Sequence, residues 1–461
     1  MAITLTELET FDIRFPTSQM LDGSDAMNAD PDYSAAYIRI HTSDATLSGD
    51  AFVFTIGRGN EVQIQALEIL AEKVAGLELE YAFAHIGDIA RALSADSQLR
   101  WLGPDKGVFH MAAGAVLNAL WDLFAKSRGV PLWKLLSDMS PEQLVETIDF
   151  RYITDALTAA EALEILKQGV PNRANNEATL LAQGLPAYTT TPGWLGYTDE
   201  KMLRLTQAAI DAGFKLIKYK CGKSLEDDRR RLTKIREFVG PDFKIAIDAN
   251  QVWDVDVAID WVNALQKFNL QWIEEPTHPD DVLGHARIAK EVSPTRVATG
   301  ELASSRIIFK QLLQAQAIKV MQIDATRAAG VNENIANILL AAKFGIPVCP
   351  HAGGVGLCEV VQHLAMFDAV AVSGHHPERV VEYVDHLHEH FIEPTNVVNG
   401  AYMPPRLPGS GAQIRDSAIE EYAFPMGAYW QSDKGLKHAV TAKMGTTKSR
   451  KQFIKQGMGA Q

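Results

Sequence analysis

The chain has 461 residues, of which 47% are hydrophobic and 22% are charged. This balance is typical of folded globular proteins and excludes disordered, collagen-like and coiled-coil chains. Its 57 acidic and 44 basic side chains give a formal net charge of −13 at pH 7. Because an acidic surface repels phosphate backbones, nucleic acid is excluded as a main partner, and an anionic substrate needs a local cation.

No feature of the sequence predicts export or a membrane partner. No run approaches about 18 consecutive apolar residues, and the start MAITLTELETFDIRF lacks the basic and apolar regions of a secretory signal. The three cysteines, Cys221, Cys349 and Cys358, lack the paired spacing of a disulfide framework or a thiolate metal site. We therefore expect a cytoplasmic protein.

Residues 1–140 predict an α+β domain at the start of the chain. A helical insertion is expected after it, at residues 155–183. The strands and helices of the first domain are expected over residues 3–15, 33–42, 62–74 and 114–126.

From about residue 184 to 385 one unit recurs, made of a short apolar run, a polar turn and a stretch with helical period. Apolar runs of this length between turns are typical of buried parallel strands. The helical stretches carry apolar side chains at i, i+3, i+4 and i+7, as at Leu205, Ala208, Ala209 and Ala212 before Gly213. The expected strands lie near residues 185–191 and at KLIKYK (215–220), KIAIDAN (244–250), LQWIEEP (270–276), TRVATGE (295–301), IKVMQIDA (318–325), IPVCPHA (346–352) and RVVEYVD (379–385).

Polar residues end successive strands at a nearly constant interval. From Asp248 the steps are 26 residues to Glu274, 27 to Glu301, 23 to Asp324, 27 to His351 and 31 to Glu382. In a closed (β/α)8 barrel such strand ends converge on one mouth, where barrel enzymes carry out their chemistry. We therefore predict an α/β fold with a (β/α)8-type (modified TIM) barrel over residues 141–400 behind the N-terminal α+β capping domain. A return segment over 401–433 and a basic, disordered tail over 434–461 are expected to follow.

Asp248, Glu274 and Glu301 offer hard oxygen ligands from three successive strands. Such ligands suit Mg²⁺, which binds a few carboxylates and leaves positions for water and substrate. Three carboxylates this close would otherwise repel one another, and a divalent cation relieves the repulsion. The competing interpretation is three solvated loop acids.

Two kinds of proton-transfer group flank this site. Lys218 and Lys220 lie two residues apart on one strand and point to the same side. Two ammonium groups held close lower each other's pKa, so one of them can act as a general base. His351 follows Asp324 by one strand, so the carboxylate can hold one ring nitrogen and leave the other for proton transfer. The alternatives are lysines that only neutralise carboxylates and a structural histidine.

Other patterns carry no predicted chemistry. Gly222-Lys223-Ser224 lacks the leading glycine of a phosphate-binding loop, and no GxSxG occurs. Histidines 375, 376, 386, 388 and 390 invite a zinc site, but histidines placed after the last strand are more typical of surface or interface groups.

At these residues the chain resembles the enolase superfamily, and specifically its mandelate-racemase-like branch. Within that branch four further segments resemble the group of L-fuconate dehydratases: residues 24–37, 186–197, 349–359 and 382–391. The superfamily resemblance rests on KxK at 218–220, IDANQVW at 247–253, IEEP at 273–276, ATGE at 298–301, QIDATRAAG at 322–330, His351, and WDLFAK at 121–126 in the capping domain.

The resemblance implies an Mg²⁺-dependent acid-sugar dehydratase that forms a 2-keto-3-deoxy acid. It implies that Lys220 removes the proton beside the substrate carboxylate and that His351, oriented by Asp324, helps to expel the 3-hydroxyl. Lys218 would balance charge, and a protonated Glu382 would hydrogen-bond the ene-diolate. Members of this branch usually associate, so a homo-oligomer is expected.

The resemblance also implies that two loops of the first domain, residues 21–33 and 50–60, close over the substrate. The expected substrate contacts are Gly23, Ser24, Asp25, Tyr33, Lys220, Asn250, Glu301, His351 and Glu382.

Three other functions stay open. A racemase or epimerase of the same branch would use the same residues, because a lysine and a histidine on opposite faces can exchange protons at one carbon. A dehydratase for another aldonic acid would also share them. A non-catalytic binding or regulatory barrel would have no need for both proton-transfer groups.

Overall fold

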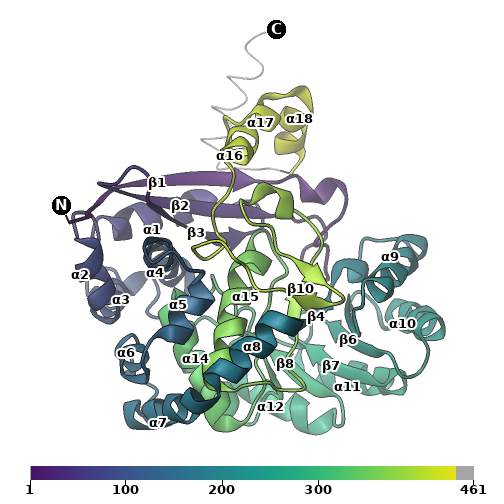
Figure 1. The fold of residues 1–461 in the computed structure, drawn as a ribbon. Coiled ribbons are helices and arrows are strands. Elements are labelled where there is room, and N and C mark those ends of the chain that lie inside the picture. The colour runs from purple at the N-terminus through teal and green to yellow at the C-terminus, as the bar shows by residue number, and fades with distance from the viewer. Residues whose placement is uncertain (1, 443–461) are drawn as a thin grey trace.

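A small antiparallel sheet and a larger, mainly parallel sheet organise the chain (Figure 1). The structure is a computed structural model that describes residues 2–442. Both sheets are flanked by helices, so the predicted α/β class with a parallel sheet is confirmed.

The N-terminal part contains a three-stranded antiparallel sheet of order β1-β2-β3. The prediction of a loop over residues 50–60 is wrong for residues 50–55. These residues belong to a strand that pairs with β2, and most of their side chains are buried. The elements are β1 (Leu5–Arg14), β2 (Ser34–Thr42), β3 (Ser48–Thr55), α1 (Asn60–Ala71), α2 (Leu79–Ala84), α3 (Ile86–Ser94) and α4 (Gly107–Ser127).

Helix α4 joins this sheet to the rest of the chain. In the described residues it is the one helix long and apolar enough to cross a membrane, and 83% of its apolar window is buried within the protein, as in a core helix. Its Trp121 donates from Nε1 to Asn332 Oδ1 at 2.8 Å, and its Asn118 donates to the carbonyl of Ala325 at 2.9 Å. Both partners belong to the larger α/β part of the chain.

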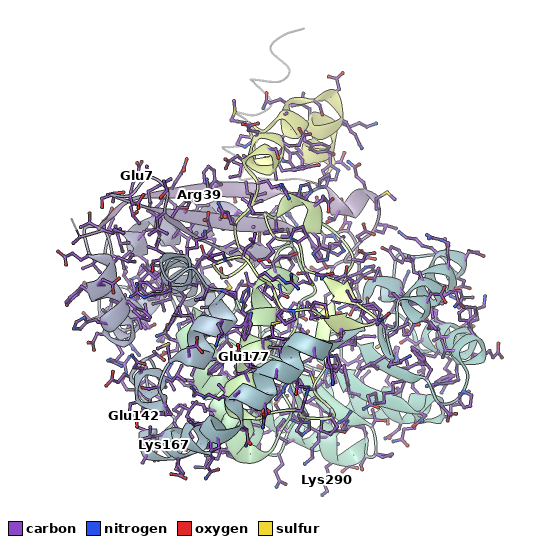
Figure 2. The ribbon with its side chains drawn as sticks, viewed as in Figure 1. Glu7, Arg39, Glu142, Lys167, Glu177 and Lys290 are labelled. Atoms are coloured by element: carbon purple, nitrogen blue, oxygen red, sulfur yellow. The ribbon has the colours of Figure 1, made fainter. Side chains whose placement is uncertain are left out.

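The expected helical insertion is present as α7 (Ala159–Gly169) and α8 (Arg173–Gln183). It follows α5 (Leu132–Asp138) and α6 (Pro141–Glu146). Thr158 begins α7 with a capping box to Glu161. Ion pairs join the insertion to the preceding helices. Lys167 and Glu142 lie 2.9 Å apart (Figure 2), and Lys134 and Glu177 lie 3.1 Å apart.

Except for the last, the parallel strands follow one another in chain order, each paired with the next, and the last strand pairs with the first. Their apolar residues are buried, as the continuous apolar runs predict. The strands are β4 (Leu185–Thr189), β5 (Leu216–Lys220), β6 (Lys244–Asp248), β7 (Leu270–Glu274), β8 (Arg296–Thr299), β9 (Val320–Met321) and β10 (Val381–Tyr383). The helices between them are α9 (Asp199–Asp211), α10 (Leu225–Val239), α11 (Val255–Leu265), α12 (Val282–Glu291), α13 (Arg306–Gln314), α14 (Gly330–Phe344) and α15 (Leu357–Phe367).

The strand predicted at residues 346–352 forms only an isolated parallel bridge between Met321 and Val348. Pro347 and Pro350 have no backbone N–H, which interrupts a regular ladder. Hydrogen bonds still link this segment to both neighbours, since Cys349 N donates to Met321 O at 2.8 Å and Glu382 N donates to Pro350 O at 3.2 Å. Because β10 pairs in parallel with β4, the hydrogen-bonding path returns to its first strand.

After β10 the chain returns to the N-terminal sheet (Figure 1). Phe424 N donates to Asp12 O at 2.7 Å, and Ser410 N donates to Asp122 Oδ1 at 2.6 Å. The prediction of a disordered tail is wrong for its first residues, because Ser432 caps a further helix. Residues 443–461 lie outside the described part. The remaining elements are β11 (Val397–Val398), β12 (Ala401–Tyr402), α16 (Asp416–Tyr422), α17 (Ala428–Gln431) and α18 (Asp433–Thr441).

Candidate active site

The carboxyl ends of the parallel strands meet at one buried site. Lys218 and Lys220 come from β5, Asp248 from β6 and Glu274 from β7. Glu301 follows β8 and Asp324 follows β9. His351 lies in the segment beside β9, and Glu382 lies on β10. The structure therefore brings together all the residues predicted from the strand-end spacing.

Asp248, Glu274 and Glu301 form a cluster that fits a divalent cation. One carboxylate oxygen from each lies within 4.8 Å of the other two. The buried Oε2 of Glu301 has no hydrogen-bond partner; its nearest charged neighbour is His351, with Nε2 3.3 Å away. Burial raises the pKa of Glu274 to about 8 although Lys218 opposes the shift. Such a concentration of buried negative charge favours a bound cation.

The two lysines lie among these acids. Lys220 Nζ is 2.5 Å from Asp248 Oδ2 and 2.9 Å from Asn250 Oδ1. Lys218 Nζ contacts Glu274 and lies 2.9 Å from Glu382 Oε1. The prediction that the lysines have lowered pKa values is wrong. Burial lowers the pKa of Lys220 and Lys218 opposes its charge, but Asp248 outweighs both and the pKa lies above its ordinary value.

His351 lies next to Asp324, as predicted. Its Nδ1 is 2.8 Å from Asp324 Oδ2, and its Nε2 is 3.3 Å from Glu301 Oε2. Burial lowers the pKa of His351, but Glu301 and the hydrogen bond to Asp324 raise it to about 9. The ring therefore carries a proton at neutral pH, which makes it a potential proton donor.

Glu382 is held in its ionised form. It accepts hydrogen bonds from Thr190 Oγ1 and, at 2.9 Å, from Ala352 N. Although burial raises the pKa of Glu382, Lys218 and His351 keep it below its ordinary value. The expectation of a protonated Glu382 is therefore wrong, because two cations face this carboxylate.

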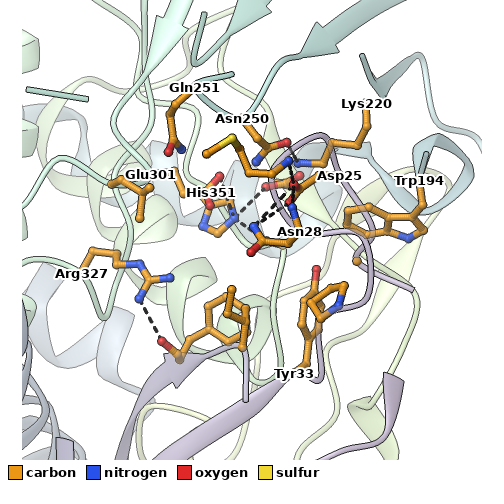
Figure 3. Close-up of a pocket in the computed structure, with 18 residues that line it drawn as sticks. Asp25, Asn28, Tyr33, Trp194, Lys220, Asn250, Gln251, Glu301, Arg327 and His351 are labelled. Atoms are coloured by element: carbon orange, nitrogen blue, oxygen red, sulfur yellow. Dashed lines mark hydrogen bonds and ion pairs between the residues drawn. The ribbon is translucent and has the colours of Figure 1, made fainter. Parts of the chain in front are cut away.

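A cavity of about 130 Å³ opens beside these groups, with the loop before β2 on its other side (Figure 3). Gly23, Asp25, Tyr33 and Asn250 line it as predicted. Ser24 is not among the lining residues. It donates to Leu21 O at 2.7 Å and accepts from Gly196 N at 2.9 Å, so it fastens the loop to the segment after β4.

Sequence reasoning missed several lining residues, notably Asn28, Trp194, Gln251 and Arg327. Gln251 and Arg327 lie within motifs used for the resemblance, beside Asn250 and three residues after Asp324 respectively, but a motif does not show which of its side chains face a cavity. Asn28 and Trp194 likewise lie within segments 24–37 and 186–197 of the resemblance, and only the path of the chain brings them to the pocket.

His386 and His388, two of the histidines predicted to be surface or interface groups, are half-buried and packed within the chain. His386 packs against the Tyr33 ring with centroids 5.2 Å apart, and burial lowers its pKa to about 4. His388 Nδ1 lies 2.5 Å from Glu359 Oε1. Burial lowers the pKa of His388, but Glu359 raises it to about 9. Of the two rings, His386 packs against side chains that line the pocket.

Comparison with known proteins identifies the family. The family model described as "Enolase C-terminal domain-like" matches residues 201–418. Mitochondrial enolase superfamily member 1 of Xenopus laevis is 52% identical over 430 residues, which cover 93% of this chain and 97% of that protein. The chain belongs to the enolase superfamily.

Other enolase superfamily members agree in function class and fold. L-galactonate dehydratase of Hypocrea jecorina is 46% identical over 442 residues, which cover 94% of this chain and 98% of that protein. The crystal structure of human mitochondrial enolase superfamily member 1 has a TM-score of 0.92 and 49% identity, over 93% of this chain and 98% of that one. The chain is an enzyme, and the predicted hydro-lyase class accords with its named dehydratase relatives.

A more distant superfamily member bears on the cofactor. A racemase from Streptomyces coelicolor A3(2), solved with bound magnesium, has a TM-score of 0.71 and 25% identity, over 91% of this chain and 99% of that one. Together with the acidic cluster, it confirms Mg²⁺ as the cofactor. Since the first relative is named mitochondrial, the cytoplasmic location stays a prediction.

Proposed function

We propose that this protein is an Mg²⁺-dependent L-fuconate dehydratase, which removes water from C2 and C3 of the acid to give a 2-keto-3-deoxy acid. The observation that carries the proposal is the pairing of Lys220 with His351 at one pocket that also borders Glu301. L-galactonate is the second candidate, because a relative of 46% identity is named for it. The two acids differ only at C6, where L-fuconate has a methyl and L-galactonate a hydroxymethyl group.

We infer that residues 141–400 form a closed (β/α)8-type barrel and residues 1–140 its capping domain. The return of the hydrogen-bonding path from β10 to β4 supports closure. The meeting of strand-end residues at one pocket is what closure would produce. The position of α4 between β3 and α14 supports a capping domain packed on a barrel.

In this proposal Asp248, Glu274 and Glu301 hold Mg²⁺. When bound, the cation supplies positive charge that stabilises the negative charge developing on the substrate carboxylate. Asn250, which already accepts from Lys220 Nζ, lies where it can orient both the amine and a substrate hydroxyl. Gly23, Asp25 and Tyr33 would contact the substrate from the capping loop.

The first step transfers the C2 proton to Lys220. The unprotonated amine takes this proton, and the electron pair of the C–H bond moves toward the carboxylate to form an ene-diolate. Asp248 and Asn250 fix the position of Nζ from two directions, so the amine needs no rearrangement to reach the substrate.

The second step expels the 3-hydroxyl. The imidazolium of His351 donates the proton on Nε2 to this hydroxyl, which leaves as water while the electron pair forms the C2–C3 double bond. Asp324 holds Nδ1 and stabilises the ring charge before transfer. The resulting enol tautomerises to the 2-keto acid. Lys218 and Glu382 make no direct transfer and set the charge around both groups.

The proposal is tested with purified protein, Mg²⁺ and a panel of six- and five-carbon aldonic acids. Keto acid formation is followed with a carbonyl reagent, and EDTA serves as the control. Turnover of L-fuconate or L-galactonate that EDTA abolishes supports the proposal. No keto acid from any member, together with exchange of the C2 proton in D₂O, would instead indicate a racemase or epimerase.

A further inference from the structure

The pocket contains a cation that the proposed mechanism does not use. Arg327 follows β9 and lines the cavity together with Lys220 and His351. In the described part of the chain, no carboxylate forms an ion pair with it. Arg327 is half-buried. Two buried arginines, Arg306 and Arg14, do form such pairs, at 3.0 Å with Glu333 and 2.5 Å with Asp12.

The guanidinium of Arg327 is nevertheless held firmly. Its Nη1 donates to the carbonyl of Phe54 at 3.0 Å and lies 3.7 Å from the sulfur of Met111. The guanidinium also lies over the Phe54 ring, 5.5 Å from its centroid. The buried Nε has no hydrogen-bond partner. Arg327 therefore has N–H groups available for a ligand, and it loses little conformational freedom when it binds one.

Its place in the pocket is opposite the reacting groups. In Figure 3 the guanidinium points into the cavity from the wall across from Lys220 and Trp194. A substrate whose C2 lies at Lys220 extends its far end across the cavity, toward this wall. Phe54, which lies under the guanidinium and also lines the pocket, offers only an apolar side chain there.

We propose that Arg327 recognises the substituent at C6 of the sugar acid and so decides which acids of one stereochemical series the enzyme prefers. This inference rests on the proposed function. A C6 carboxylate would accept a charge-assisted pair of hydrogen bonds, and a C6 hydroxyl would accept one. A C6 methyl accepts no hydrogen bond, so the guanidinium would keep only its contacts with Phe54 and Met111.

Three acids test this directly, because they share the configuration at C2 to C5 and differ only at C6. They are L-fuconate with a methyl, L-galactonate with a hydroxymethyl, and galactarate, in one of its two orientations, with a carboxylate. Binding of each acid in the presence of Mg²⁺ is measured by calorimetry on the Lys220→Ala variant, with and without Arg327→Met. Turnover is measured in parallel on the enzyme with Lys220 intact.

We expect Arg327→Met to weaken galactarate binding by on the order of 100-fold and L-galactonate binding by roughly 10-fold. L-fuconate binding should change by less than about 3-fold. Arg327→Lys, which keeps the charge but loses the planar fork, should fall between these limits for galactarate. Met111→Leu, which alters the far side of the guanidinium, is the matched control and should leave the order of the three acids unchanged.

An equal loss for all three acids would overturn the inference, since it would show that Arg327 acts only through its contact with Phe54. An unchanged series would overturn it as well. Should Arg327→Met fail to fold, Arg327→Lys and Arg327→Gln provide the same comparison. Failure of the proposed function is distinct, because it appears as binding of the acids without any keto acid formed by the enzyme with Lys220 intact.

Discussion

At the scale of single residues, burial and neighbouring charges decide the protonation state of each group in the pocket. Burial alone would neutralise Lys220 and His351, yet both carry a proton because Asp248 and Glu301 face them. Lys218 and His351 in turn keep Glu382 ionised. The proposed mechanism therefore begins with an acid ready in His351 and requires Lys220 to release its proton before it acts as the base.

The division of labour between the two proton-transfer groups predicts different defects. Lys220→Ala should abolish both C2 proton exchange and dehydration, since general-base catalysis contributes about 10²- to 10⁴-fold. His351→Asn should retain exchange of the C2 proton and lose dehydration. Exchange is followed by NMR in D₂O and dehydration by keto acid assay, with the exposed Lys223→Ala as the control. Turnover retained in Lys220→Ala would remove this lysine from the base role.

The acidic cluster predicts a sharp contrast between neighbouring carboxyl groups. Glu301→Gln should weaken Mg²⁺ binding by at least about 10-fold, with activity falling in parallel. Glu275 lies beside the cluster and accepts from Gln251, and burial raises its pKa above the ordinary value. Since that side chain already accepts from Gln251 and is not one of the three clustered carboxylates, Glu275→Gln should leave Mg²⁺ binding within about 3-fold. Calorimetric titration with Mg²⁺ distinguishes the two, and equal losses would contradict the ligand assignment.

A buried histidine away from the pocket predicts acid sensitivity. His363 accepts from Trp133 N at 3.1 Å, and burial lowers its pKa from 6.5 to about 3. The unfolded chain binds a proton below pH 6.5 while the folded chain does not, so this contribution to stability is present above that pH. It is lost as the pH falls toward 3.

The free energy of unfolding should therefore fall by about 1.4 kcal/mol per pH unit between about pH 6 and pH 4 through this group alone. His363→Asn keeps an acceptor for Trp133 and removes the titration. Urea unfolding at several pH values should show a shallower acid dependence for the variant. Parallel curves for the two proteins would show that His363 is not the responsible group.

At the scale of elements, α18 contacts the loop that lines the pocket. His438 Nε2 lies 3.0 Å from Asp32 Oδ2, and Gln19 Nε2 donates to Tyr429 OH at 2.7 Å. Asp32 stands between Pro31 and Tyr33, which both line the cavity. The C-terminal helices thus act on the substrate loop one residue from its contacts.

Loss of this contact should loosen the loop without altering the proton-transfer groups. We expect His438→Ala to raise KM by roughly 3- to 10-fold with little change in kcat, since ordering the loop on binding would then cost about 1 kcal/mol more. Lys437→Ala, on the exposed side of the same helix, is the matched control. A fall in kcat at constant KM would contradict a role in positioning the loop.

At the scale of the whole molecule, the N-terminal part and the parallel-sheet part share one core along α4. Gly114 on this helix approaches the loop before α14 so closely that a Cβ would lie 2.5 Å from Ala328 O and 2.8 Å from Gly330 N. Neither neighbour is a flexible side chain end, so the close approach requires glycine. The homo-oligomer expected of the family stays a prediction that light scattering would check.

This shared core predicts cooperative unfolding of the two parts. Gly114→Ala should lower the stability by about 1–3 kcal/mol, the usual effect of overpacking. Differential scanning calorimetry should show one transition in both proteins, shifted to lower temperature in the variant. Two separated transitions would show that α4 does not couple the parts.

The sequence predicted the acidic cluster, the lysine pair and His351 because parallel strands alternate with helices at a regular length. Polar residues spaced by 23 to 31 positions from Asp248 to Glu382 therefore meet at one end of the sheet. The same reasoning placed the strands correctly except at 346–352, where Pro347 and Pro350 interrupt the ladder.

The helix at 433–441 and the strand over 48–55 were missed because each depends on partners distant in the chain, Asp32 and β2 respectively. The protonation states of Lys220 and Glu382 depend likewise on distances to charged groups, which sequence spacing does not encode. The same holds for the position of Arg327 at the pocket. The sequence by itself determined which residues gather at the strand ends, since strand and helix periodicity is local. Only the tertiary structure decided their charge states and which side chains face the substrate, because burial and Coulomb interactions depend on the packing of the whole molecule.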